Sequence, residues 1–231
     1  MSERIRSLTI PPVTGKAPSA RAALRHAVRV YHPERLAMVS AFGPGSAVLV
    51  HLLHEIGARV PVVFVDTLHH FPETLEHVER VRDRYDVDLR VVRPAPNRAA
   101  FEAQFGPRLW ERDLELYQRL TKVDPFRAAI ASLDAYITGR RRDQSAARAQ
   151  LDWNEPGAPA RINPLAYWTR DNVWNFIREH ALPYNPLHDR GYASIGDEPL
   201  TTPVAAGEAE RAGRWRGSGR LECGIHGIHA T

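Results

Sequence analysis

The sequence has only one cysteine, Cys223, among its 231 residues. A single thiol cannot form a disulfide within the chain, which excludes the small secreted proteins that are held together by bridges and favours a reducing compartment. The first twenty residues also lack the long apolar run of a signal peptide or a membrane span. We therefore expect a cytoplasmic protein that does not interact with a membrane.

Lysine is also rare. Only Lys16 and Lys122 occur, so arginine supplies most of the positive charge. The net charge is +4, but the sequence has no long basic run and no basic patch interleaved with aromatic residues. This pattern predicts no nucleic-acid partner. A small polyanionic ligand, in contrast, needs only a few well-placed guanidinium groups.

The hydrophobic periodicity alternates between strands and helices. Unbroken apolar runs such as PVVFVD are typical of strands that are covered on both faces. Ser19, Asp124 and Thr169 are predicted helix N-caps. Strands are predicted at 36–39, 61–66, 88–94 and 135–138, and helices at 19–31, 47–57, 71–85, 124–133 and 169–182. This alternation predicts an α/β fold with a mostly parallel sheet.

The two ends of the chain lack this periodicity. We expect residues 1–18 to form a loose arm and residues 19–195 to form a nucleotide-binding α/β domain. Residues 196–231 are expected to form a mobile tail, since a long stretch without its own secondary structure is usually functional or disordered.

Ligands of open parallel sheets bind beyond the carboxyl ends of the strands. The loop SAFGPGS, residues 40–46, has small residues that let backbone N–H groups face an anion at a helix N-terminus. It is not a Walker A loop, because no Gly-Lys-Ser/Thr follows. In VDTLHHFPET, residues 65–74, Asp66 suits either a ribose hydroxyl or a local Asx-turn, and His69 and His70 are interpreted as loop residues.

The segment TGRRRDQSAAR, residues 138–148, follows the last predicted strand of the sheet. Its guanidinium groups at Arg140, Arg141, Arg142 and Arg148 suit phosphate or sulfate. A solvated helix start is the alternative interpretation. Gly139, directly before the arginines, favours anion binding.

Cys223 lies in GRLECGIHGIHAT, residues 219–231, with few apolar neighbours to bury it. A closed zinc site needs four ligands, and no second cysteine is present. Arg220 and His226 would lower the pKa of the thiol, whereas Glu222 would raise it. An exposed thiol in this setting suits a nucleophile.

These pieces together resemble one family. ECGIH resembles the C-terminal Glu-Cys-Gly-Leu-His motif of the phosphoadenylyl-sulfate (PAPS) reductases and their adenylyl-sulfate (APS) reductase relatives. SAFG, DTLHHFPET, TGRRRDQSAAR and residues 162–197 resemble four further motifs of that family in the same order. The resemblance extends from about Arg21 to His226.

The resemblance implies a doubly wound, adenine nucleotide α-hydrolase-like α/β fold with a flexible C-terminal tail. It also implies thioredoxin-dependent reduction of PAPS to sulfite, in which the Cys223 thiolate attacks the sulfur of the substrate and His226 orients or steers that thiolate. Thioredoxin or a similar dithiol protein then releases sulfite, so no bound cofactor is expected. The family is often dimeric, and the sequence leaves the oligomeric state open.

Positive groups must neutralise both the leaving phosphate and the attacking thiolate. Ser40, Phe42 and Gly43 are expected at the sulfate and phosphate end of the substrate, and Asp66 near the adenosine. The full set of expected substrate-binding residues is Ser40, Phe42, Gly43, Asp66, Lys122, Arg141, Arg142, Arg148 and Arg220.

Many APS reductases of this family hold a [4Fe–4S] cluster on two cysteine pairs. Tyr117 and Gln118 stand where the first pair would be, and Asp197 and Leu200 where the second would be. Four thiolates cannot come from one cysteine, so we expect no cluster and no metal. This favours PAPS as the substrate, and a cluster-free APS reductase is the alternative.

Two other classes stay open. An adenylating ATP pyrophosphatase of the same superfamily would have a Ser-Gly-Gly-x-Asp-Ser loop, whose aspartate is absent from SAFGPGS, and it would leave Cys223 without a role. A non-catalytic nucleotide-binding relative would be expected to have lost the motif around Cys223.

Overall fold

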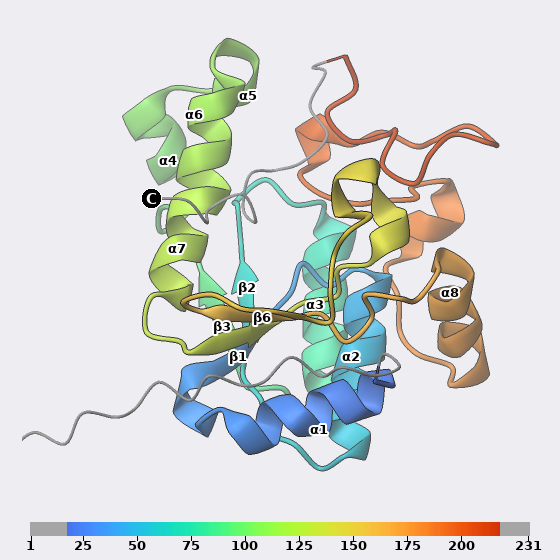
Figure 1. Cartoon of the computed structure of the whole chain (residues 1–231). Coiled ribbons are helices and arrows are strands. Elements are labelled where there is room, and N and C mark those ends of the chain that lie inside the picture. Colours follow the sequence, from blue (N-terminus) through green and yellow to red (C-terminus); the bar gives the residue numbers. More distant parts are fainter. Residues whose placement is uncertain (1–17, 218–231) are drawn as a thin grey trace, which may run out of the picture.

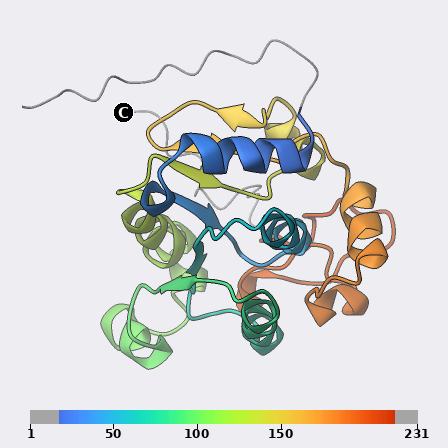
Figure 2. The same ribbon diagram turned by 90° about the horizontal axis from the view of Figure 1, so that it is seen from below.

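The computed structural model describes residues 18–217, which form a six-stranded sheet with helices on both faces (Figures 1 and 2). The sheet has the order β3-β2-β1-β4-β6-β5, and every pairing is parallel except that of β5 with β6. The strands are β1 (Leu36–Val39), β2 (Val62–Val65), β3 (Leu89–Val92), β4 (Ala135–Ile137), β5 (Asn154–Glu155) and β6 (Ala160–Ile162). The predicted α/β class with a mostly parallel sheet is confirmed.

The helices divide between the two faces of the sheet (Figures 1 and 2). One face is covered by α1, α2, α3 and α8, and α7 packs on the other face. The helices are α1 (Ala20–Val30), α2 (Pro44–Glu55), α3 (Pro72–Tyr85), α4 (Arg98–Phe105), α5 (Leu109–Arg112), α6 (Leu114–Gln118), α7 (Asp124–Ile130) and α8 (Arg170–Glu179). This two-sided cover is the doubly wound arrangement that the resemblance implied.

Alternating side chains of β1 build the two cores. Leu36 and Met38 join the core on the α2 side, and Ala37 joins the core on the α7 side with Phe126 and Ile130. Successive side chains of a strand point to opposite faces, so a strand buried on both faces needs apolar residues throughout. This is why β1 and β2 are unbroken apolar runs.

Two of the three predicted N-caps are confirmed. The hydroxyl of Ser19 accepts a hydrogen bond from the backbone N–H of Ala22, and that of Thr169 accepts one from Asn172. Asp124 is not a cap, because a π-helical turn, Arg119–Val123, runs directly into α7. Helix α2 begins at Pro44, ahead of the predicted start, because proline is tolerated at the first helical position.

Residues 196–217 pack against the sheet domain, so the packed part of the chain extends beyond the expected boundary at residue 195. The backbone N–H of Glu198 donates to the carbonyl of His69 over 2.8 Å, and that of Trp215 donates to Leu200 over 2.9 Å. Asp197 is fully buried. Within residues 18–217, no helix has the length and apolar character to cross a membrane. The expected arm, residues 1–18, lies outside the described residues except for its last residue.

Candidate anion-binding cleft

The central pair of strands, β1 and β4, forms a topological switch point. From β1 the chain continues to β2 and β3 on one side, and β4 pairs with β6 on the other. The loops that follow β1 and β4 therefore diverge at the carboxyl edge of the sheet, where they leave a crevice. Residues of both loops line a cavity of about 200 Å³.

The loop after β1 is held by its own side chains. Oγ of Ser40 accepts a hydrogen bond of 2.8 Å from the backbone N–H of Phe42, which has a φ of 53°. The Phe42 ring is buried edge-to-face against Phe64, with 5.6 Å between the centroids. Gly43 is the N-cap of α2 and lines the cavity. The partial positive charge of a helix N-terminus consequently faces the cleft.

The two loops touch through glycine backbones. A Cβ atom on Gly45 would lie 3.1 Å from the carbonyl oxygen of Gly139, and one on Gly139 would lie 3.3 Å from the carbonyl carbon of Gly45. Side chains at either position would push the first turn of α2 away from the arginine segment. This contact explains the glycine directly before the arginines.

Arg141 and Arg148, two of the predicted arginines, line the cavity and are buried. Nε of Arg141 lies 2.9 Å from Asp143, and Nη2 lies 2.8 Å from Glu210. The guanidinium of Arg148 donates to Oε1 of Gln144. The cavity side chains of Arg141 and Arg148 are thus fixed before any ligand arrives.

Arg142 points elsewhere. Its Nε donates to the carbonyl of Leu151 over 2.6 Å, and its guanidinium lies 4.4 Å from the centre of the Tyr167 ring. Arg140, which was not in the expected binding set, lines the cavity instead and pairs with Glu155 over 2.8 Å. The side chains do not alternate along this run: Arg140 and Arg141 both line the cavity, and Arg142, which begins the 3₁₀ turn Arg142–Gln144, does not.

Lys122 and Asp66 are not among the residues that line this cavity in the described part of the chain. Nζ of Lys122 lies 2.5 Å from the carboxylate of Asp197. Asp66 accepts a hydrogen bond from the backbone of Leu68 over 2.9 Å and one from Nε of Arg93 over 2.8 Å. The first of these bonds is the Asx-turn that the sequence offered as an alternative.

Two histidine rings line the cavity, and neither was in the expected binding set. His70 stacks on Phe64 with 5.0 Å between centroids, and burial lowers its pKa. His188 has its Nδ1 2.6 Å from the carbonyl of Tyr192, and burial lowers its pKa to about 4. Near neutral pH both rings are uncharged. Nε2 of His70 lies 3.2 Å from the carbonyl of Val65, so in each ring the nitrogen beside a carbonyl carries the proton and the other nitrogen can only accept a hydrogen bond. The signals in the sequence were the position of His70 within DTLHHFPET and that of His188 within residues 162–197.

Cys223, His226 and Arg220 lie outside the described residues. The larger hollow of about 680 Å³ beside α8 contains none of the predicted site residues. The described site is therefore the glycine loop, the start of α2 and the arginine segment.

The fold and the cleft define an α/β protein with a basic crevice at the switch point of a parallel sheet. A family model described as "Phosphoadenosine phosphosulfate reductase domain" matches residues 35–203. The chain belongs to the phosphoadenosine phosphosulfate reductase family.

Named relatives agree with this assignment. The chain is 43% identical over 211 residues to the phosphoadenosine 5'-phosphosulfate reductase of Gloeobacter violaceus, covering 89% of this chain and 87% of the relative. It is 41% identical over 197 residues to the adenosine 5'-phosphosulfate reductase of Halalkalibacterium halodurans, covering 84% and 85%. The crystal structure of a phosphate complex of the PAPS reductase of Candida auris aligns with a TM-score of 0.73 and 34% identity, covering 81% of this chain and 91% of that one.

Proposed function

We propose that this protein reduces PAPS to sulfite and adenosine 3',5'-bisphosphate, with thioredoxin as the electron donor, in assimilatory sulfate reduction. The observation that carries the proposal is the meeting of the glycine loop, the N-terminus of α2 and the buried arginines at one switch point. These groups suit an anion, and family membership identifies the class of anion as a sulfonucleotide.

The chemistry begins with the Cys223 thiolate. Its sulfur attacks the sulfur of PAPS, and the bond between that sulfur and the bridging phosphate oxygen breaks. The nucleotide leaves with the electron pair, and the enzyme keeps an S-sulfocysteine. A thiolate of thioredoxin then attacks the sulfur of Cys223 and sulfite leaves. The second thiol of thioredoxin resolves the mixed disulfide, which returns Cys223 as a thiolate and leaves thioredoxin oxidised.

Each described part of the cleft has a task in this proposal. The first turn of α2 and the guanidinium groups of Arg141 and Arg148 stabilise the charge that builds up on the leaving phosphate. Arg140 adds a third guanidinium group to the same cavity. The cavity of about 200 Å³ is smaller than a typical ligand pocket of roughly 300–1,000 Å³, so it suits the sulfate and phosphate end of the nucleotide.

PAPS is preferred over APS because the cluster positions do not fit an iron–sulfur cluster. Tyr117 is buried among apolar side chains with Leu200 packed against it, and Asp197 is paired with Lys122. None of these side chains offers a thiolate, which a [4Fe–4S] cluster requires. Absence of the cluster is usual in the PAPS-using branch of the family that this chain resembles.

The second candidate is a cluster-free APS reductase that releases sulfite and AMP. It is favoured by the name of the relative from Halalkalibacterium halodurans, an adenosine 5'-phosphosulfate reductase at 41% identity.

The deciding experiment measures sulfite release by the purified full chain with thioredoxin, comparing PAPS and APS as separate substrates. We expect a higher kcat/KM for PAPS. A higher kcat/KM for APS would leave the role of Cys223 unchanged but would make APS, and not PAPS, the substrate. Release from neither substrate would contradict the proposed reaction.

A further inference from the structure

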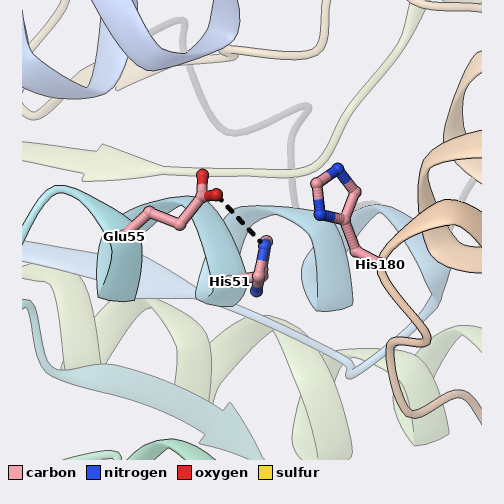
Figure 3. A group of neighbouring side chains, drawn as sticks. All are labelled: His51, Glu55 and His180. Carbon is pink, nitrogen blue, oxygen red and sulfur yellow. Dashed lines mark ion pairs between the residues drawn. The ribbon is translucent and has the colours of Figure 1, made fainter.

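A group of metal-ligating side chains lies away from the cleft, at the C-terminal half of α2 (Figure 3). His51 and Glu55 are one helical turn apart on α2, and His180 follows the last residue of α8. One ligand atom from each residue lies within 4.8 Å of the other two. Figure 3 shows His51 between the other two side chains. The cleft, in contrast, lies at the N-terminal end of α2.

The geometry is close to that of a bound transition metal. Nε2 of His51 lies 3.5 Å from Oε1 of Glu55. Ligand atoms that bind one tetrahedral metal at about 2.0–2.1 Å are roughly 3.4 Å apart, so this pair already has the required spacing. The His180 ring is half-buried at the end of its helix, and its ligand atom lies within 4.8 Å of the other two.

Nε2 of His51 is buried but makes no hydrogen bond within residues 18–217. The other ring nitrogen, Nδ1, lies 3.5 Å from the hydroxyl of Tyr85. A buried polar atom without a partner is costly, and a bound ion or water is one way to satisfy it. The histidine ligands of metals usually bind through one nitrogen while the other makes an outer hydrogen bond, which is the arrangement of His51.

Glu55 has one oxygen available for a metal. Arg21 on α1 donates to Oε2 through both Nε and Nη2, over 3.0 and 2.7 Å, and leaves Oε1 facing His51. The His180 ring is stacked on Phe176 with 4.1 Å between centroids, which sets its plane. Each of the three ligands is therefore oriented by a neighbour outside the ligand set.

The ligand chemistry selects the class of metal. Two imidazoles and one carboxylate suit a divalent transition ion such as Zn²⁺, and hard cations such as Mg²⁺ prefer oxygen ligands alone. We propose that His51, Glu55 and His180 bind a divalent transition metal that joins the C-terminal half of α2 to the end of α8. Water completes the coordination. This site is separate from the cleft, so the proposal does not rest on the proposed function.

The test is titration of the full chain with Zn²⁺ in a calorimeter and with Co²⁺ by visible absorption, with Mg²⁺ as a control metal. Residues 218–231 contain other ligating side chains, so the titration is repeated with Cys223→Ser, His226→Gln and His229→Gln combined. We expect one equivalent of Zn²⁺ to bind to both proteins. Zn²⁺ should also raise the melting temperature, since a ligand that binds the folded state stabilises it. Mg²⁺ should do neither.

The variants His51→Gln and His180→Gln should each weaken Zn²⁺ binding at least roughly tenfold, because even an outer-shell change typically costs about 10- to 100-fold. The matched control is His54→Gln, an exposed histidine on the same helix, which should leave binding unchanged. If His51→Gln fails to fold in the presence of a chelator, His180→Gln still tests the proposal, because it changes a half-buried residue at the end of α8. Absence of Zn²⁺ binding, binding that only the tail substitutions remove, or equal losses in His54→Gln would each overturn the proposal.

Discussion

Nζ of Lys122 and the carboxylate of Asp197 form a buried ion pair of 2.5 Å between residues 75 positions apart in the chain. The exposed fractions of the two side chains are 8% and 0%. Thr67 donates its hydroxyl to the second carboxylate oxygen over 2.8 Å. Burial alone would raise the pKa of Asp197, but Lys122, with His70 and Thr67, lowers it below its usual value. The pair ties the segment after residue 195 to the π-helical turn before α7, and the Thr67 hydrogen bond ties it to the loop after β2.

The first prediction concerns this pair. Asp197→Asn and Lys122→Met should each lower the free energy of unfolding by about 3–5 kcal/mol, because either change leaves a buried partner uncompensated. The double change, Lys122→Met with Asp197→Leu, should cost less than either single change. Urea denaturation measures all three. The matched control is Asp88→Asn, which breaks the exposed pair with Arg90 and should cost less than about 1 kcal/mol. Single variants as stable as this control would contradict the prediction.

The second prediction separates neighbouring arginines. Arg148→Lys should raise the Kd for the nucleotide by roughly 10- to 100-fold, since it removes the planar donor set of a group that lines the cavity. Arg142→Lys, whose guanidinium contacts Leu151 and Tyr167, should leave the Kd nearly unchanged and lower stability instead. Calorimetric titration with adenosine 3',5'-bisphosphate measures both. Equal losses of affinity would show that the cavity contacts do not decide binding.

The third prediction concerns acid stability. His77 in α3 is buried and His188 is half-buried, and the loss of solvent around each ring lowers its pKa to about 4. The unfolded chain therefore binds more protons between pH 6.5 and pH 4, so stability should fall as the pH is lowered through this window and should be level above it. Each histidine accounts for about 3 kcal/mol of that fall.

Denaturation curves at pH 7 and pH 4.5 test this dependence. His77→Gln should reduce the difference in unfolding free energy between the two pH values, whereas the exposed His54→Gln should leave it unchanged. A wild-type protein that is equally stable at both pH values would rule out the buried neutral histidines as the cause.

The sheet could be predicted from the sequence because its central strands carry their own pattern. β1 and β2 are apolar throughout, and Ser19 and Thr169 have the cap chemistry that starts a helix. Helices α4 to α6 were not predicted, because their short amphipathic turns are held by tertiary packing. Phe101, Leu109 and Tyr117 bury one another in a small core of their own.

Part of the site could also be predicted from the sequence. Arg141 and Arg148 could be assigned to the carboxyl edge because they follow a strand. Which members of the arginine run face the cavity depends on the backbone path after Gly139, and that path depends on the close contact with Gly45. The pairing of Lys122 with Asp197 is a contact between distant segments, and no local pattern carries it.

The last prediction concerns the single cysteine, which lies outside the described residues. Cys223→Ser should abolish sulfite release with thioredoxin, because an alcohol at neutral pH is a far weaker nucleophile than a thiolate. The Kd for the nucleotide should stay nearly unchanged, since the glycine loop and the arginines of the cleft are intact. Wild-type protein incubated with PAPS and no reductant should carry a sulfonate adduct detectable by mass spectrometry, and the serine variant should not. A serine variant that still turned over would remove Cys223 from the reaction. Loss of nucleotide binding in the serine variant would instead show that Cys223 helps to form the binding site. The arginine variants, which lower the affinity for the nucleotide but keep the thiol, are the comparison for that outcome.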